Sequence, residues 1–260
     1  MPIELSMGNA ISANVQYSSE VRRAFEENLD HKKIEVWSVR TPMRVLIAIK
    51  SCNKDAARGC HRAIRETWGA EVEGADLRFF VGEDPLAFRS VDTIVLPNCP
   101  DDYAGLPQKT RAILAWSIDH GYDFPFLCDT DTFLIPPRLL ACGFENYDLT
   151  GCIGGNLEGG KYFPWPSGGA GYFLSQKAAW IVALSKTIDT AEDRMIGQIL
   201  LRENAEGNPK SLNHPGFHRV YPDDPLRCDV TLHFDGRGAK QQAYNPKWMY
   251  EVYAHNRGLK

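Results

Sequence analysis

The sequence has no apolar run long enough to cross a lipid bilayer and no cluster of consecutive lysines and arginines. A membrane-spanning helix needs about 20 largely apolar residues, and binding to nucleic acid or anionic lipid depends on positive charge. The net charge of -4 and the pI near 6.0 provide no general attraction for either polyanion. We therefore expect no membrane segment in this chain, and binding to duplex DNA is disfavoured.

The chain also lacks the features of a secreted, disulfide-bonded protein. Residues 1–20 have no basic start followed by a continuous apolar stretch, which a secretory signal requires. The seven cysteines are an odd number, are scattered, and include no C-x-x-C pair. We expect reduced thiols and a cytoplasmic protein. Two alternatives stay open: a bridge between Cys52 and Cys60, and a soluble form of a lumenal enzyme.

Strand and helix patterns alternate along most of the sequence. Residues 43–52, 76–83, 91–97 and 124–129 have the apolar character of strands, and helices are expected at 60–69, 105–122, 176–185 and 193–203. This alternation predicts an α/β fold with one Rossmann-like, mostly parallel sheet and helices on both faces. We expect residues 1–40 to form an accessory segment with a helix at 18–29, and residues 41–260 to form the main domain.

Two aspartates follow a predicted buried strand. In FLCDTDTFLI, residues 126–135, Asp129 and Asp131 lie at the carboxyl end of that strand, where ligands of such sheets gather. Two carboxylates that converge on one ion favour a hard divalent metal. The alternative is that Asp129 stabilises a turn and Asp131 caps a helix near Pro136.

Five segments resemble, in the same order, those of the inverting β-1,3-glycosyltransferases, a family that includes the Fringe proteins and the β-1,3-galactosyl- and N-acetylglucosaminyltransferases. They are RAIRETWG (62–69), DDYAGLPQKT (101–110), CDTDTFL (128–134), YFPWPSGGAGYFLS (162–175) and AEDRMIG (191–197). The sequence departs from the family pattern at Gly105, Thr130 and Arg194.

The resemblance implies a single GT-A domain and a Mn²⁺ or Mg²⁺ ion that binds a UDP-sugar. It implies that Asp129 lies near the donor ribose or the metal, that Asp131 binds the metal directly, and that His233 of TLHFDG is a further ligand. The alternatives for His233 are a packed strand histidine or Asp235 in its place. Weaker alternatives are His214, His218 and His255.

An inverting transferase also needs a general base that removes the proton of the acceptor hydroxyl. The resemblance assigns this role to Asp193, and we favour it over Glu192. By position alone, both carboxylates are first-turn residues that the helix dipole favours.

Four basic residues are candidates for contacts with the diphosphate or uracil, because ammonium and guanidinium groups suit phosphate oxygens. They are Lys50, Arg62, Arg65 and Lys109, and for each the alternative is a surface ion pair.

The glycine-rich segment offers a second kind of candidate. Gly168, Gly169 and Gly171 would let the backbone approach a bound sugar, or they form a simple bend. Tyr162 and Trp165 either stack on a sugar or cover the core. Trp68 is expected in the core.

The resemblance implies a metal-dependent transferase that moves a hexose or N-acetylhexosamine from a UDP-sugar to an acceptor hydroxyl, with a β-1,3 linkage. The alternatives are a retaining transferase, a nucleotidyltransferase, or an inactive sugar-binding relative. The acceptor is a glycan, a protein, a small molecule or a modified nucleobase, and the sequence does not decide among them.

Overall fold

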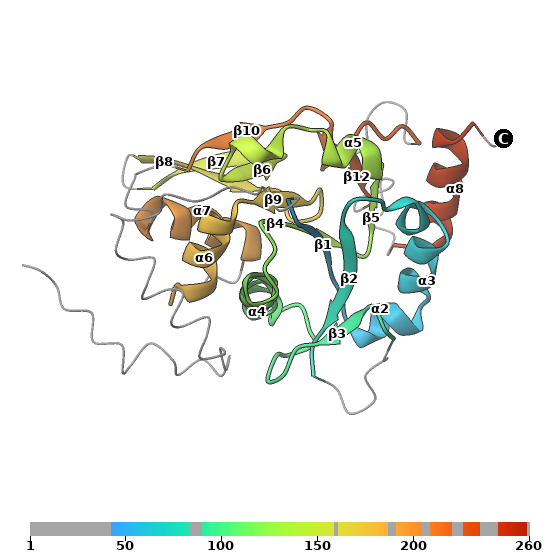
Figure 1. The fold of residues 1–260 in the computed structure, drawn as a ribbon, viewed down its shortest axis with the longest axis horizontal. Coiled ribbons are helices and arrows are strands. Elements are labelled where there is room, and N and C mark those ends of the chain that lie inside the picture. The colour runs from blue at the N-terminus through green and yellow to red at the C-terminus, as the bar shows by residue number, and fades with distance from the viewer. Residues whose placement is uncertain are drawn as a thin grey trace, which may run out of the picture.

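A seven-stranded sheet of order β10-β6-β9-β4-β1-β2-β3 forms the centre of the protein (Figure 1). The computed structural model describes residues 43–83, 90–158, 161–186, 191–203, 209–219, 226–234 and 244–258. All neighbouring strands in this sheet are parallel except β9, which runs antiparallel to both β4 and β6. The strands are β1 (Val45–Lys50), β2 (Asp76–Val81), β3 (Thr93–Val95), β4 (Phe124–Asp129), β6 (Leu149–Gly151), β9 (Tyr172–Leu174) and β10 (Ser211–Asn213).

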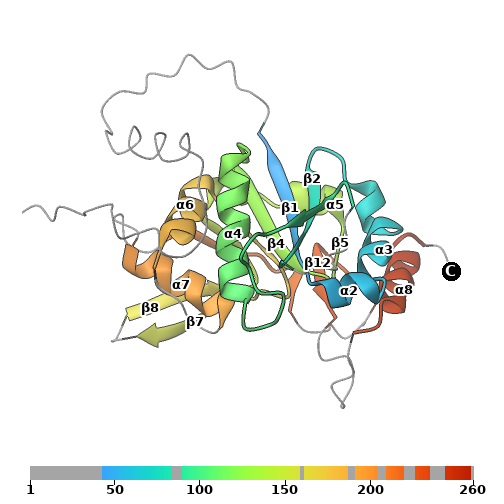
Figure 2. The ribbon, with the colours of Figure 1, turned by 90° about the horizontal axis from the view of Figure 1, so that it is seen from below.

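Helices cover both faces of the sheet, as Figure 2 shows from a second direction. One face packs against α4 (Leu106–Asp119), α6 (Gln176–Leu184) and α7 (Glu192–Glu203). The opposite face packs against α3 (Cys60–Arg65), α5 (Pro136–Leu140), α8 (Lys247–Asn256) and a small sheet of order β11-β12-β5. The small sheet consists of β5 (Thr132–Leu134), β11 (Phe217–His218) and β12 (Thr231–His233). The predicted α/β class with a mostly parallel sheet is confirmed.

The residues of β1 explain why this strand lies in the middle. Leu46 and Ala48 face one core cluster, whereas Val45, Ile47 and Ile49 face the other. Side chains of a strand alternate between faces, so a strand covered on both sides needs apolar residues at every position. The strand ends with Lys50, next to the end of β4, and the functional residues begin there.

Most elements predicted from the sequence are present. The expected helix at 105–122 is α4, with Pro107 in its first turn, and Ser175 caps α6 by accepting the Ala178 N–H at 3.2 Å. The expected helix at 60–69 instead ends at Arg65 and continues as a 3-10 turn, η2 (Trp68–Glu71). Gly69 lies so close to the Ile64 carbonyl that a Cβ atom there would be 2.6 Å from its oxygen.

The remaining elements are short. They are α2 (Asn53–Ala57), η3 (Phe144–Asn146) and a hairpin of β7 (Ile153–Glu158) and β8 (Lys161–Pro166). The sequence did not predict the hairpin. Trp68 is in the core, as expected, and is 1% exposed.

Three further expectations concern the cysteines, a membrane segment and the N-terminal segment. All seven cysteines are free thiols, so the Cys52–Cys60 bridge is not formed. No helix in the described ranges combines the length and apolar character needed to span a bilayer. The predicted accessory segment 1–40, its helix at 18–29 and Asp235 lie outside the described residues.

His61 generates a prediction about pH and stability. Its ring is buried, stacks on Phe79 and lies 2.7 Å from Ser51 Oγ through Nε2, while Nδ1 has no hydrogen-bond partner. Burial, with the nearby positive charge of Arg65, lowers the pKa of His61 to about 4. The unfolded chain takes up this proton near pH 6.5 and the folded chain does not. The stabilisation is therefore complete above pH 6.5 and is lost as the pH falls toward 4.

We expect the free energy of unfolding to fall by about 2 kcal/mol more between pH 7 and pH 5 in the native protein than in His61→Gln. Urea denaturation of both proteins at the two pH values measures this difference. Identical pH dependence in the two proteins would show that His61 does not supply it.

Candidate active site

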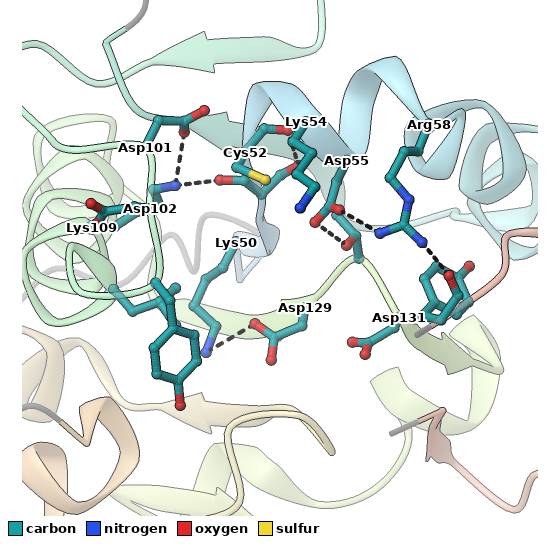
Figure 3. Close-up of a pocket in the computed structure, with 15 residues that line it drawn as sticks. Lys50, Cys52, Lys54, Asp55, Arg58, Asp101, Asp102, Lys109, Asp129 and Asp131 are labelled. Carbon is teal, nitrogen blue, oxygen red and sulfur yellow. Dashed lines mark hydrogen bonds and ion pairs between the residues drawn. The ribbon is translucent and has the colours of Figure 1, made fainter. Parts of the chain in front are cut away.

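A pocket of about 500 Å³ opens where β1 and β4 end (Figure 3). Its wall includes Lys50 from β1, Asp129 at the end of β4 and Asp131 just after it. Residues of α2 also line it, and Asp55 of this helix accepts a hydrogen bond from Thr130 Oγ1 at 3.0 Å. The carboxyl ends of parallel strands meet at one edge of a sheet, and this is where ligands bind in open α/β folds. The pocket is therefore where the sequence predicts the site.

Asp129, Asp131 and His233 form a cluster that could hold a metal ion. One ligand atom from each lies within 4.8 Å of the others, and His233 Nε2 is 3.4 Å from Asp131 Oδ2. Antiparallel pairing of β12 with β5 places His233 opposite Thr132, and the Phe234 N–H donates to the Asp131 carbonyl at 3.0 Å. A strand from a distant part of the chain thus supplies the third member of the candidate cluster, the histidine that the resemblance implies as a ligand.

The chemistry of this cluster fits a divalent cation. Two carboxylates suit Mg²⁺ or Mn²⁺, and the imidazole favours the transition metal. The side chain of Asp129 is 31% exposed, that of Asp131 is 21% exposed and that of His233 is 14% exposed. Solvent or a bound phosphate can therefore reach them. Burial and the negative charge of Asp131 raise the pKa of Asp129 to about 6, despite the opposing charge of Lys50. A bound cation would offset this repulsion.

Thr132 holds the turn between the two aspartates. Its hydroxyl accepts the Asp129 N–H at 3.2 Å and donates to the Gly169 carbonyl at 2.7 Å. A Cβ atom at Gly169 would overlap the His233 ring. The glycine is therefore needed to leave room for the histidine. This packing requirement is separate from the role first expected for Gly169, which was to let the backbone approach a bound sugar.

The neighbouring Gly168 faces a second group of charged residues. A Cβ atom at Gly168 would lie 3.0 Å from Glu192 Oε2, 3.4 Å from Lys50 Nζ and 3.8 Å from Asp193 Cβ. Residues 168–169 thus separate the candidate metal cluster from the first turn of α7. Glu192 and Asp193 lie in that first turn; neither lines the pocket, and Glu192 is linked to Asp129 through Lys50.

Glu192 and Asp193 have different surroundings. Glu192 is buried and accepts hydrogen bonds from Lys50 at 3.2 Å, from Thr110 Oγ1 at 2.8 Å and from the Tyr172 hydroxyl. Asp193 is partly buried and accepts the Arg194 backbone N–H at 2.7 Å. Burial and the charge of Glu192 raise the pKa of Asp193. Asp193 is therefore the more accessible of the two carboxylates.

The four predicted basic contacts do not gather at one place. Lys50 and Lys109 line the pocket, but the buried Lys109 ammonium donates to the Ser51 carbonyl and to Asp101 at 3.1 Å. Arg62 and Arg65 do not line this pocket. Arg65 forms a two-pronged pair with Asp92, at 2.8 and 2.7 Å.

The structure adds residues that sequence reasoning missed. Asp101 accepts the backbone N–H groups of Asn53 and Gly82, each at 2.6 Å, in addition to Lys109, and so ties the loop after β1 to the end of β2. Arg58 lines the pocket and donates to the Tyr244 carbonyl. The only sequence signal for Asp101 was its place in the DDYAGLPQKT segment.

Other predicted residues lie farther from the cluster. Tyr162 is 53% exposed on the β7–β8 hairpin, and Trp165 belongs to the same hairpin. His218 pairs with Asp229 at 2.9 Å rather than with the two aspartates of the site.

No protein-family model matches this sequence, and a comparison with curated proteins gives no match. Solved structures with a similar fold include the galactosyltransferase LgtC in complex with donor and acceptor sugar analogues, at 12% identity and a TM-score of 0.43, covering 82% of this chain and 96% of that one. A glycosyltransferase involved in glycosylation of the major capsid of PBCV-1 has 10% identity and a TM-score of 0.46, covering 81% and 98%.

The inositol-1-phosphate CTP transferase from T. maritima is also similar, with 12% identity and a TM-score of 0.43, covering 82% of this chain and 97% of that one. All of these identities and TM-scores are low. An activity must therefore be inferred from the side chains of the site itself.

Gly169 allows a direct test of the metal cluster. We expect Gly169→Ala to push the His233 ring out of the cluster and to weaken Mn²⁺ binding by about 10-fold. Titration of free Mn²⁺ by electron paramagnetic resonance measures the affinity.

His233→Ala is the matched control and should weaken binding by a similar factor. Because both changes act on the same ligand, the double variant should bind Mn²⁺ no more weakly than either single variant. Native affinity in Gly169→Ala would remove His233 from the ligand set.

Proposed function

We propose that this protein is a metal-dependent glycosyltransferase of the GT-A type that uses a UDP-sugar as donor. The observation that carries the proposal is the convergence of Asp129, Asp131 and His233 at the carboxyl end of the sheet, beside a pocket of about 500 Å³. Asp129, Asp131 and His233 would hold Mn²⁺ or Mg²⁺. When bound, such an ion supplies positive charge that stabilises the departing diphosphate.

The residues around the pocket support binding of the nucleotide part of the donor. The ion pairs of Lys109 and Asp101 hold the loop after β1, and this loop with α2 forms the wall facing the two aspartates. Lys54 and Arg58 of the same wall carry positive charge and suit phosphate oxygens. We assign donor binding to this wall. The roles first expected for Arg62 and Arg65 are not retained in this proposal, since neither lines the pocket.

We assign the general base to Asp193. It would take the proton from an acceptor hydroxyl as that oxygen attacks the anomeric carbon and the bond to the diphosphate breaks. The raised pKa of its carboxyl increases its basicity, and the side chain is only partly buried. Glu192 is less suited because its oxygens are occupied by Lys50, Thr110 and Tyr172.

The resemblance to inverting β-1,3-glycosyltransferases supports the finer parts of the proposal: a hexose or N-acetylhexosamine, inversion at the anomeric carbon, and a β-1,3 linkage. The acceptor is a glycan, a protein, a small molecule or a nucleic acid. The alternatives are a retaining transferase, and a nucleotidyltransferase such as the similar CTP transferase. Proton magnetic resonance of the product distinguishes inversion from retention.

Nucleotide sugars should stabilise the protein only with a divalent cation. We expect UDP-sugars with Mn²⁺ to raise the melting temperature, because a ligand at 100 times its Kd adds about 2.7 kcal/mol to stability. CTP, GDP-sugars and UDP-sugars with EDTA should have smaller effects. A thermal-shift screen measures all of these in one experiment.

In the same screen, Asp131→Asn should abolish the effect of Mn²⁺, whereas Asp119→Asn, at an exposed position of α4, should behave as the native protein. Equal stabilisation with and without metal would contradict the proposal.

Asp193→Asn tests the general base. We expect turnover of the best UDP-sugar to fall at least about 10²-fold, because the amide cannot take the proton. UDP binding should stay within about 3-fold, because Asp193 does not line the pocket that we assign to the nucleotide. Release of UDP measures turnover, and calorimetry measures binding. Full turnover in this variant would move the base to another residue.

A further inference from the structure

Lys50 lies between two carboxylates that belong to opposite sides of the candidate site. Its Nζ atom is 3.3 Å from Asp129 Oδ1 and 3.2 Å from Glu192 Oε2. The side chain is 1% exposed and that of Glu192 is 6% exposed. Lys50 therefore joins the end of β4, which carries a predicted metal ligand, to the start of α7, which carries the predicted base.

Glu192 is held from a second direction. Its Oε1 atom accepts hydrogen bonds from Thr110 of α4, at 2.8 Å, and from the Tyr172 hydroxyl of β9. Thr110 and Tyr172 are both fully buried, and the Tyr172 ring centroid is 5.5 Å from Lys50 Nζ. The bridge from Asp129 through Lys50 to Glu192 is thus anchored to two further elements of the core, α4 and β9.

The surrounding backbone matches this bridge. Gly168 is where a side chain would crowd the junction, since a Cβ atom there would be 3.0 Å from Glu192 and 3.4 Å from Lys50. A buried ion pair between flexible side chains keeps one geometry only when its polar atoms are satisfied and its space is filled. Both conditions hold here.

We propose that Lys50 and Glu192 are positioning residues that set the separation between the metal-binding aspartates and Asp193. This inference rests on the proposed transferase function. It revises the role first expected for Lys50, because an ammonium that is buried between two carboxylates is not available to the phosphates of a donor. The pair acts on catalysis through Asp129 and Asp193 and does not contact the substrate.

The two roles of Lys50 predict different kinetics. Loss of a phosphate contact weakens UDP binding, whereas loss of a positioning bridge leaves binding largely intact and lowers kcat. A displacement of about 1 Å in a reacting group can cost about 10²-fold in rate. We therefore expect Lys50→Met to lower kcat by about 10²-fold while the Kd for UDP at saturating Mn²⁺ changes by less than about 3-fold.

Glu192→Gln gives an independent test, because the amide oxygen can still accept the hydrogen bonds of Thr110 and Tyr172 but the charge that attracts Lys50 is gone. We expect it to lower kcat by about 10-fold, again with UDP binding preserved. The double variant should be no slower than Lys50→Met alone, since both substitutions break one bridge. Lys177→Met, at an exposed position of α6, is the matched control and should retain native kinetics.

Calorimetry with UDP and Mn²⁺ gives the binding constants and also verifies that each variant is folded. UDP release from the best UDP-sugar of the thermal-shift screen gives kcat. A loss of UDP affinity of 10-fold or more in Lys50→Met, with kcat retained, would make Lys50 a phosphate ligand and overturn the inference. Native kcat in both variants, or additive losses in the double variant, would also overturn it. If the native protein neither binds UDP nor turns over a nucleotide sugar, the proposed function itself fails.

Discussion

The site depends on repulsion between carboxylates that the fold brings close together. Asp129 and Asp131 lie at one edge of the sheet with Glu192 nearby, and the buried positive charge that the structure places among them is that of Lys50. Burial, together with the like charges of Asp131 and Glu192, disfavours ionisation of Asp129 and raises its pKa. A divalent cation would supply the further positive charge that these carboxylates need. The bound cation would in turn attract an anionic diphosphate. Sheet geometry and ligand chemistry thus point to the same class of substrate.

The geometry of this cluster depends on contacts between distant parts of the chain. The pairing of β12 with β5 brings His233 to Asp131, and the bend at Gly168 and Gly169 gives room to His233 on one side and Glu192 on the other. A larger residue at either glycine would displace a charged or metal-binding side chain rather than an apolar one. The glycines therefore act on the chemistry of the site through packing.

The sequence predicted the parts of this arrangement that local patterns encode. Continuous apolar runs are typical of strands covered on both faces, which is why β1 and β4 were found, and the Asp129–Asp131 pair was located from its place after such a run. Local patterns carry no information about the partner of a charged side chain. Arg65 lies in a recognisable segment, yet Asp92 holds it away from the pocket. Lys50 was expected to face a phosphate, because nothing in its neighbours along the chain reveals that Glu192 approaches it from a position 142 residues away.

The same limit explains why two adjacent carboxylates could not be ranked firmly from sequence. Glu192 and Asp193 begin one helix, and the helix dipole favours both equally. Their surroundings separate them. Three donors surround Glu192 and keep it as an acceptor, whereas burial and the charge of Glu192 raise the pKa of Asp193, which is only partly buried. Pairs of titratable groups whose environments differ in this way divide acid–base and structural roles between them. In the proposed mechanism, the buried Glu192 is thus not a second base, and its charge adds to the effect of burial in raising the pKa of Asp193, to which we assign that role.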